Sequence, residues 1–261
     1  AVSRVDASTN RSDNNTSDIW LMDLGRGVPN RVTFEGAMSA LAWSPDGGRV
    51  AYPNAGSPPN LFVQDVTTAG STERLVSSHN TQSFPDWSPD GRLLLYVEAV
   101  NDPSSTTRTD LQLLSLDGAR TITPYLHTSF AETHGRFSPD GKWVAYTSDE
   151  SGRNDVYVQS FPVGGPKRRI SSQGGDFARW RHDGKELFYM ATDGTLMAVP
   201  VQAVSSSLTF GEPKPLFKIA GRAGTYDVAP DGQRFLALPP AADDAAPSMT
   251  LVVNWPTLVK K

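Results

Sequence analysis

Trp43-Ser44-Pro45-Asp46-Gly47 decides the fold, because this short stretch holds the signals for a strand end followed by a tight turn. Proline sets φ at the first central turn position, aspartate is tolerated at the second, and glycine supplies a left-handed backbone conformation. Proline also lacks a backbone donor, so it belongs at the end of a strand. The stretch, called the cassette below, predicts a β-hairpin whose second strand follows at once.

The cassette returns four more times along the chain. The cassette aspartates are Asp46, Asp90, Asp140, Asp183 and Asp231, which by subtraction gives steps of 44, 50, 43 and 48 residues. The first three copies read Ser-Pro-Asp-Gly, the fourth keeps only Asp-Gly, and the fifth keeps Pro-Asp-Gly. One cassette indicates a hairpin, but five at this period predict a repeat architecture of the WD type, with about four short strands in each unit.

We therefore expect an all-β fold, a β-propeller of six blades with about four antiparallel strands each. The predicted blades of this single domain (1–261) are 1–34, 35–76, 77–123, 124–171, 172–217 and 218–261. Inner strands are expected at 85–88, 135–138 and 178–181, and the third and outer strands of the fifth blade at 196–201 and 215–217. The first and last blades each lack a strand, which favours six blades closed by both ends over five blades with spare strands.

Four of the units carry a pair of aromatic residues. The first members precede the turn and the second members stand six residues after the cassette aspartate: Trp43, Trp87, Phe137 and Trp180, then Tyr52, Tyr96, Tyr146 and Tyr189. Large rings bury much apolar surface and pack between neighbouring sheets. We expect these aromatics to fill the space between blades rather than to stack on a ligand.

Composition excludes several classes of function. A net charge of −4 gives no electrostatic basis for binding nucleic acid, and the basic run Lys167–Arg169 indicates a solvated strand edge. The chain has no cysteine, which excludes disulfides and thiolate catalysis. No stretch approaches the roughly 20 apolar residues of a membrane-spanning helix, so we expect no direct membrane insertion of this chain.

The long polar loops of one propeller face are the expected place for binding. They cover 7–17, 98–110, 124–134 and 239–248. His79, Glu132 and His134 stand on loops that enter inner strands on this face. Their ligand types suit zinc or manganese, but His79 lies a whole blade from the other two, so hydrated loop histidines are the simpler interpretation.

A charged loop at 149–155 contributes two more candidate binding residues, Asp149 and Arg153. Its acids lack the alternating spacing and the terminal glutamate of an EF-hand loop, which favours turn formation and surface ion pairs over calcium. We therefore predict a binding surface built from His79, Glu132, His134, Asp149 and Arg153. We predict no catalytic residue, no metal and no cofactor in this chain.

The tandem Ser-Pro-Asp-Gly cassettes resemble the TolB-like β-propeller repeat family. The stretches 137–161, 183–189, 231–236 and 252–255 are similar to the C-terminal propeller sensor region of bacterial serine/threonine protein kinases. The resemblance covers essentially the whole chain. It implies an extracytoplasmic or periplasmic module that binds a protein, peptide or envelope ligand. It also implies tethering to a kinase domain through an upstream membrane helix.

Enzymatic motifs are missing from the sequence. It contains no glycine-rich phosphate loop, no His-Arg-Asp sequence and no Gly-x-Ser-x-Gly elbow. We therefore predict a non-enzymatic binding or sensor module. Two alternatives stay open: the substrate-gating propeller of a prolyl oligopeptidase-type serine peptidase without its catalytic domain, and a stand-alone propeller hydrolase or lyase that uses channel carboxylates and a metal.

Overall fold

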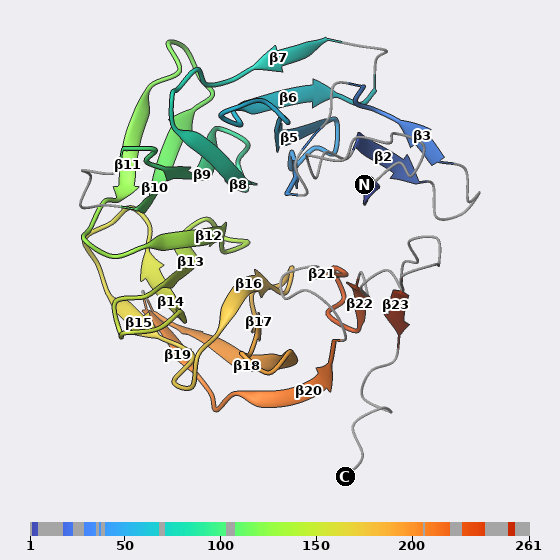
Figure 1. Ribbon diagram of the computed structural model, residues 1–261. Coiled ribbons are helices and arrows are strands. Elements are labelled where there is room, and N and C mark those ends of the chain that lie inside the picture. The colour runs from blue at the N-terminus through green and yellow to red at the C-terminus, as the bar shows by residue number, and fades with distance from the viewer. Residues whose placement is uncertain are drawn as a thin grey trace. The chain divides into compact units, whose positions relative to one another are not determined.

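The computed structural model describes residues 2–4, 18–22, 29–34, 37, 40–67, 71–102, 108–205, 207–219, 226–237 and 250–253. All regular elements within these ranges are β-strands, and the strands belong to six antiparallel sheets (Figure 1). The chain divides into two compact units, Ala1–Ser129 and Phe130–Lys261. Each unit is described by itself.

The first unit holds three sheets whose strands pair in chain order. The first sheet contains β1 (Val2–Arg4), β2 (Asp18–Met22) and β3 (Pro29–Arg31). The second contains β4 (Ala42–Trp43), β5 (Arg49–Pro53), β6 (Leu61–Asp65) and β7 (Thr72–Arg74). The third contains β8 (Thr81–Trp87), β9 (Leu93–Ala99), β10 (Thr109–Ser115) and β11 (Ile122–Leu126).

The second unit also holds three sheets. Its first sheet contains β12 (Glu132–Phe137), β13 (Trp143–Ser148), β14 (Asp155–Ser160) and β15 (Lys167–Arg169). Its second contains β16 (Asp176–Trp180), β17 (Glu186–Met190), β18 (Thr195–Val204), β19 (Ser207–Phe210) and β20 (Lys214–Lys218). Its third contains β21 (Tyr226–Val228), β22 (Arg234–Ala237) and β23 (Thr250–Val253).

The cassette forms the predicted hairpin turn. In the first copy the Gly47 amide donates to the Ser44 carbonyl at 2.9 Å, and the Ser44 hydroxyl donates to Asp46 Oδ1 at 2.5 Å. The cassette glycines are all left-handed, with φ of 70° at Gly47 and 68° at Gly232. The turn chemistry read from the sequence is therefore confirmed.

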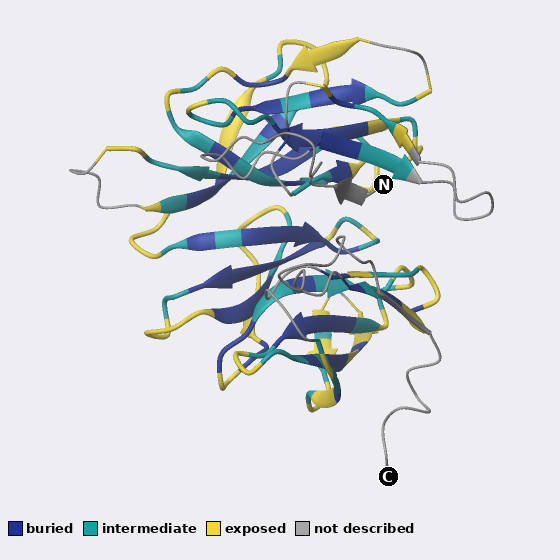
Figure 2. Ribbon diagram, turned by 45° about the vertical axis from the view of Figure 1, so that its right-hand side comes forward, coloured by how far each residue is buried: buried dark blue, intermediate teal, exposed yellow. Residues whose placement is uncertain are grey.

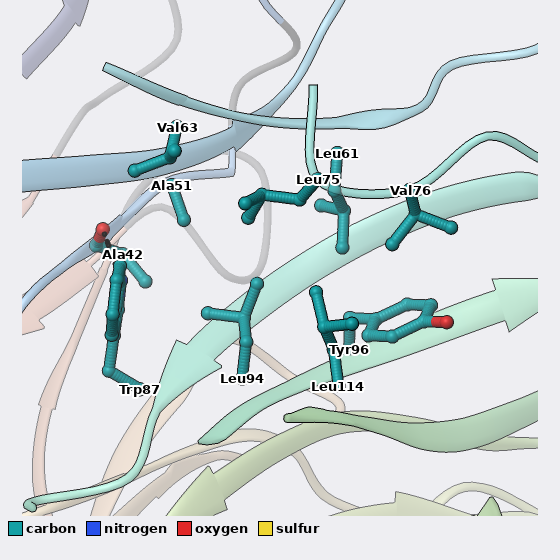
Figure 3. Packing of buried hydrophobic residues seen from close by; sticks show 10 residues of the cluster. All are labelled: Ala42, Ala51, Leu61, Val63, Leu75, Val76, Trp87, Leu94, Tyr96 and Leu114. Atoms are coloured by element: carbon teal, nitrogen blue, oxygen red, sulfur yellow. Dashed lines mark hydrogen bonds between the residues drawn. The ribbon is translucent and has the colours of Figure 1, made fainter. Parts of the chain in front are cut away.

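Buried side chains fill the space between neighbouring sheets within each unit. In the first unit, Figure 3 shows Trp87, Leu94 and Tyr96 facing Leu61 and Val63 of the preceding sheet. The outer strands β7 and β15 are exposed throughout, while the middle strands are largely buried (Figure 2). The core of each unit thus lies between its sheets, as expected for stacked blades.

Most of the paired aromatics pack between neighbouring sheets as predicted, and those found in the inter-sheet clusters are Tyr52, Trp87, Tyr96, Trp180 and Tyr189. All four tyrosines of the pairs are buried, and the Trp87 indole N–H donates to the Ala42 carbonyl of the preceding inner strand at 3.3 Å. Trp180 makes the corresponding bond to the Arg136 carbonyl at 3.2 Å. Trp43 differs, because 37% of its surface stays exposed.

Two strand predictions are corrected by the structure. The inner strands β8, β12 and β16 begin at Thr81, Glu132 and Asp176, which is four, three and two residues before the predicted starts at 85, 135 and 178. In the sheet of β16–β20, β18 continues to Val204 and pairs with an additional strand, β19, in the register Val201↔Phe210. Apolar and polar residues alternate in 201–203 and in 208–210, which supports this ribbon. The predicted strands at 196–201 and 215–217 left no strand between them, so β19 corrects that prediction.

Candidate functional site

Three inner strands carry the same irregularity at the same place. In β8, β12 and β16 the register shifts so that two residues lie opposite one tyrosine of the next strand, which is a β-bulge. The first bulge residue has a left-handed backbone in each case, with φ of 50° at Phe84, 54° at His134 and 56° at Phe177. Such angles are uncommon outside glycine and cluster at functional sites.

The bulges correct the predicted setting of two candidate residues. Glu132 and His134 were expected on an entry loop, but both lie within β12 and both are buried. The ladder resumes on the far side of the bulge, where Glu132 pairs with Ser148 and Thr133 with Thr147. A bulge interrupts the alternation of apolar and polar residues by which a strand is recognised in sequence, so the predicted strand began only after the bulge, at 135.

In the second unit, Asp176 connects the bulges of β12 and β16. Its Oδ1 lies 2.7 Å from His134 Nδ1 and accepts hydrogen bonds from the Thr147 hydroxyl at 2.6 Å and the Phe177 amide at 2.7 Å. The His134 and Phe177 rings lie against each other, with centroids 4.1 Å apart. One carboxylate therefore holds two left-handed residues of adjacent sheets in a fixed arrangement.

Burial sets the protonation of this pair. Burial lowers the pKa of His134, and the hydrogen bond to Asp176 only partly opposes this effect. Burial alone would raise the pKa of Asp176, but the hydrogen bonds from His134, Thr147 and the Phe177 amide outweigh it and hold that pKa below its ordinary value. At neutral pH the pair is thus a neutral imidazole that donates through Nδ1 to an ionised carboxylate.

A polar and aromatic border surrounds the pair. The Tyr226 hydroxyl of β21 donates to the Phe177 carbonyl at 2.7 Å. The Arg179 guanidinium lies 5.8 Å from the Tyr226 ring centroid, and its Nε is 3.9 Å from Asp227 Oδ1. Asp227 is 77% exposed, so this contact is loose and open to exchange. We call His134, Asp176, Phe177, Arg179 and Tyr226 the bulge site.

Two arginines stand at equivalent places at and beside the bulge site. Arg136 and Arg179 stand directly before the cassette aromatics of β12 and β16, at equivalent places in the two sheets. Both positive charges act on the His134 imidazole and on the Tyr226 hydroxyl. A guanidinium offers several donors in a rigid plane, so this border suits carboxylate, amide or other acceptor groups of a ligand.

The remaining predicted residues lie elsewhere. His79 belongs to the first unit, where its side chain is exposed and its carbonyl accepts a bond from Asn101 Nδ2 at 2.8 Å. Asp149 Oδ1 accepts from the Ala131 amide at 2.9 Å, next to the start of β12. Arg153 lies 3.5 Å from Asp155 through its Nε. Of the predicted set, the structure brings Glu132 and His134 onto one strand and places Asp149 beside that strand.

Two loops of the predicted binding face, 7–17 and 239–248, lie outside the described residues. Of the other two, 98–110 begins and ends in β9 and β10, and 124–134 begins and ends in β11 and β12. Within the ranges that the structure describes, no three His, Asp or Glu side chains gather in a way that could hold a metal ion. The same ranges contain no helix long and apolar enough to cross a membrane.

Sequence reasoning missed Asp176, Phe177, Arg179 and Tyr226. A usable signal was present, since Phe84, His134 and Phe177 each stand three residues before a cassette aromatic. When the segments that precede the cassettes are aligned, a large ring stands at the same position in three of them, and the alternation of apolar and polar residues does not account for it. The link through Asp176 was not visible, because it joins residues 42 positions apart in the sequence.

Acid is expected to destabilise this protein in two steps. Burial lowers the pKa of His134 in the folded protein, whereas in the unfolded chain this pKa stays near its ordinary value of about 6.5. As the pH falls below about 6.5, the unfolded chain therefore takes up this proton more readily than the folded protein does, and the free energy of unfolding decreases. The pKa of Asp176 is lowered in the folded protein, so its ionised carboxylate stabilises the fold at pH values above about 3.9, the ordinary pKa of an aspartate in the unfolded chain. This stabilisation is lost as the pH falls through the lower pKa of the folded state.

Urea unfolding at a series of pH values measures both steps. A His134→Asn variant, which tolerates the left-handed backbone, should lack the decline that begins near pH 6.5 and keep the one below about pH 4. An unchanged profile in this variant would contradict the assignment of the first step to His134.

Comparison with known proteins places these sheets in a wider group. The family model described as TolB beta propeller domain (PD40) matches residues 38–210. "Uncharacterized peptidase YuxL" of Bacillus subtilis is 27% identical over 185 residues, which are 56% of this chain and 28% of that protein. The chain thus spans less than a third of this curated relative.

Solved structures agree with the family match. TolB from Acinetobacter baumannii has a TM-score of 0.79 at 19% identity, over 97% of this chain and 60% of that one. An oligogalacturonate lyase in complex with manganese has a TM-score of 0.65 at 16% identity, over 92% of this chain and 69% of that one. At such identities the likeness shows the fold, an all-β propeller, as the cassettes predicted. By its match over 38–210, the chain belongs to the TolB beta propeller domain family.

Proposed function

We propose that this chain is a binding module that recognises a protein or peptide ligand through the bulge site. The observation that carries the proposal is the bond between His134 Nδ1 and Asp176 at 2.7 Å, which ties two strained backbone positions of adjacent sheets together. Strain maintained in this way pre-organises a surface before a ligand arrives. Arg179 and the exposed Asp227 supply polar groups at the border of that surface.

Binding explains the geometry better than catalysis does. A general base must present a nitrogen within hydrogen-bond reach of the substrate. The His134 side chain is only 10% exposed, its Nδ1 is bonded to Asp176, and its ring is packed against Phe177. These contacts support a positioning role for His134, in which it holds the bulge of β12 in place.

The family resemblance extends the proposal to a cellular setting. Membership of the TolB beta propeller domain family supports an extracytoplasmic module that binds a protein of the envelope. The resemblance of 137–161 to kinase-linked propellers suggests a longer protein in which the module reports ligand binding to a kinase domain across the membrane. Of the five binding residues predicted from sequence, the proposal keeps three. His134 belongs to the bulge site, Glu132 lies on the same strand, and Asp149 lies beside the start of that strand.

Selection from a phage-displayed peptide library tests the proposed function. Peptides enriched on the unaltered chain should bind at least 10-fold more weakly to an Arg179→Gln variant, because one charge-assisted hydrogen bond contributes about 1.5–3 kcal/mol. Arg168→Gln is the matched control, since Arg168 lies on the exposed outer strand β15. Equal binding to both variants, or no enrichment at all, would refute the proposal.

A second candidate function, that of a lyase, rests on the likeness to a manganese-bound oligogalacturonate lyase. Incubation with polygalacturonate and manganese tests it through the ultraviolet absorbance of unsaturated products. Activity that disappears in His134→Asn would establish the lyase alternative. The likeness to a Bacillus subtilis peptidase supports the remaining alternative, a propeller that gates a separate catalytic domain.

A further inference from the structure

Three sheets share an internal contact that we call the arginine clamp. In each, an arginine of the outer strand lies opposite an aromatic residue of the neighbouring strand and reaches the polar side chain two residues before that aromatic. The clamps are Arg31 with Asp18, Arg74 with Asn60, and Arg169 with Asp155. In all three the arginine Nε also donates, at 3.0 Å, to the carbonyl two residues further along.

A hydroxyl completes two of the clamps. Thr33 Oγ1 donates to Asp18 Oδ1 at 3.1 Å, and Ser171 Oγ donates to Asp155 Oδ1 at 2.7 Å. Each buried carboxylate thus receives an arginine on Oδ2 and a hydroxyl on Oδ1. This arrangement pairs and solvates a charge that would otherwise be costly to bury.

The sheet of β8–β11 keeps the carboxylate and lacks both donors. Pro124 stands opposite Gln112, at the register position that arginine occupies in the three clamps, and Leu126 replaces the hydroxyl residue. Asp110 stands two residues before Gln112, where Asp18 and Asp155 stand in their sheets. In the sheet of β16–β20 a proline, Pro215, also takes the arginine position, but the corresponding residue there is the neutral Thr195.

Asp110 is consequently a buried carboxylate with an incomplete set of partners. Its side chain is 3% exposed, Oδ2 lies 2.8 Å from Nδ1 of the exposed His127, and Oδ1 has no hydrogen-bond partner within the described residues. Glu98 stands directly opposite in the register of β9 and β10. Two acidic residues facing each other across a strand pair are destabilising unless a cation lies between them.

The intact clamps show how a cation reaches such a carboxylate. The Arg169 side chain is 38% exposed, yet its guanidinium lies 2.6 Å from an Asp155 side chain that is fully buried. An arginine lying along an exposed outer strand can therefore reach the buried position from the solvent side. Ile122 and Pro124 of β11 are exposed, so the same route is present in this sheet.

We propose that Asp110 and Glu98 form a recognition site for an arginine side chain supplied by a partner protein. The guanidinium would lie over Pro124 and donate to Asp110 and to the Leu126 carbonyl, as Arg169 donates to Asp155 and the Ser171 carbonyl. Its planar array of donors fits both acceptors at once, which the single ammonium group of lysine does not. The site lies in the first unit and does not depend on the bulge site.

Thermal unfolding with short capped peptides tests this inference. At constant ionic strength, acetyl-Gly-Arg-Gly-amide should raise the melting temperature saturably, by about 3–5 °C at ten times its Kd. The corresponding lysine peptide should have a clearly smaller effect. Asp110→Asn should lose the response, and Asp117→Asn, which alters an exposed carboxylate of the same sheet, should keep it.

A variant that fills the site from within keeps the inference testable if Asp110→Asn fails to fold. Pro124→Arg combined with Leu126→Ser recreates the clamp, so it should melt about 2–4 °C higher without peptide and should no longer respond to the arginine peptide. Equal responses to the arginine peptide, the lysine peptide and sodium chloride would overturn the inference. So would a saturable response to calcium chloride that needs Asp110, because the site would then bind a metal ion. Failure of the bulge-site proposal would be seen in a different measurement, the peptide binding of the Arg179→Gln and Arg168→Gln variants.

Discussion

Replacing Asp155 by alanine is expected to lower the free energy of unfolding by about 3–5 kcal/mol, because the change leaves a buried network without its acceptor. The Asp155 side chain is fully buried and accepts from the Ser151 and Ser171 hydroxyls, both at 2.7 Å, and from the Gly174 amide at 3.0 Å. It also pairs with Arg169 at 2.6 Å. These contacts join β14, the turn before it and the segment that leads into β16, so their loss should loosen all three.

Chemical unfolding monitored by tryptophan fluorescence measures this effect. Asp117→Asn is the control. Asp117 is exposed and pairs with the exposed Arg92, so its loss should change the free energy of unfolding by less than about 0.5 kcal/mol. The two variants remove the same kind of charge from different surroundings. A loss in Asp155→Ala as small as that of the control would show that the network carries no net stability.

Phe188→Ala is expected to cost about 3–5 kcal/mol, the range measured for truncating a buried phenylalanine. Phe188 of β17 is fully buried, and its ring meets Phe235 of β22 edge to face at a centroid distance of 5.1 Å. Leu196 and Leu216 belong to the same cluster. The variant should therefore weaken the packing between the second and third sheets of the second unit in particular.

Phe188→Leu separates loss of volume from loss of shape. It keeps most of the apolar volume and should cost less than half as much as the alanine variant. Hydrogen exchange gives the location of the damage, and the amides of β21 and β22 should lose protection before those of β13 and β14. Uniform loss across the second unit would contradict the view that Phe188 links one particular pair of sheets.

Because the sheets of this chain repeat, equivalent positions in different sheets can be compared with one another. The bulges at Phe84, His134 and Phe177 have the same backbone shape, and only His134 is not a phenylalanine. Among the sheets compared for the arginine clamp, the sheet of β8–β11 keeps the buried aspartate but has Pro124 and Leu126 in place of the two donors. Positions that share a structural role in several sheets are explained by folding. Departures from the shared pattern, such as His134 among phenylalanines or Asp110 without an arginine, are where a function specific to this protein is most reasonably sought.

The sequence alone was sufficient for the fold class, because a Pro-Asp-Gly corner has a local cause. Proline and glycine restrict or permit φ wherever they stand, so the hairpins at Asp46, Asp90 and Asp140 could be placed without knowledge of their surroundings. The burial of Tyr96 and its equivalents followed from the same period. Family membership rests on the same local motifs, which recur throughout 38–210.

The candidate sites were decided by the tertiary structure. Asp176 reaches His134 from another sheet, Arg169 reaches Asp155 from the neighbouring strand, and Asp110 lies in register with Glu98. These contacts depend on strand register and on the bulges, and a shift of one residue would turn each side chain to the opposite face. Local sequence preferences specify where a strand ends and turns, but long-range packing determines which side chains meet.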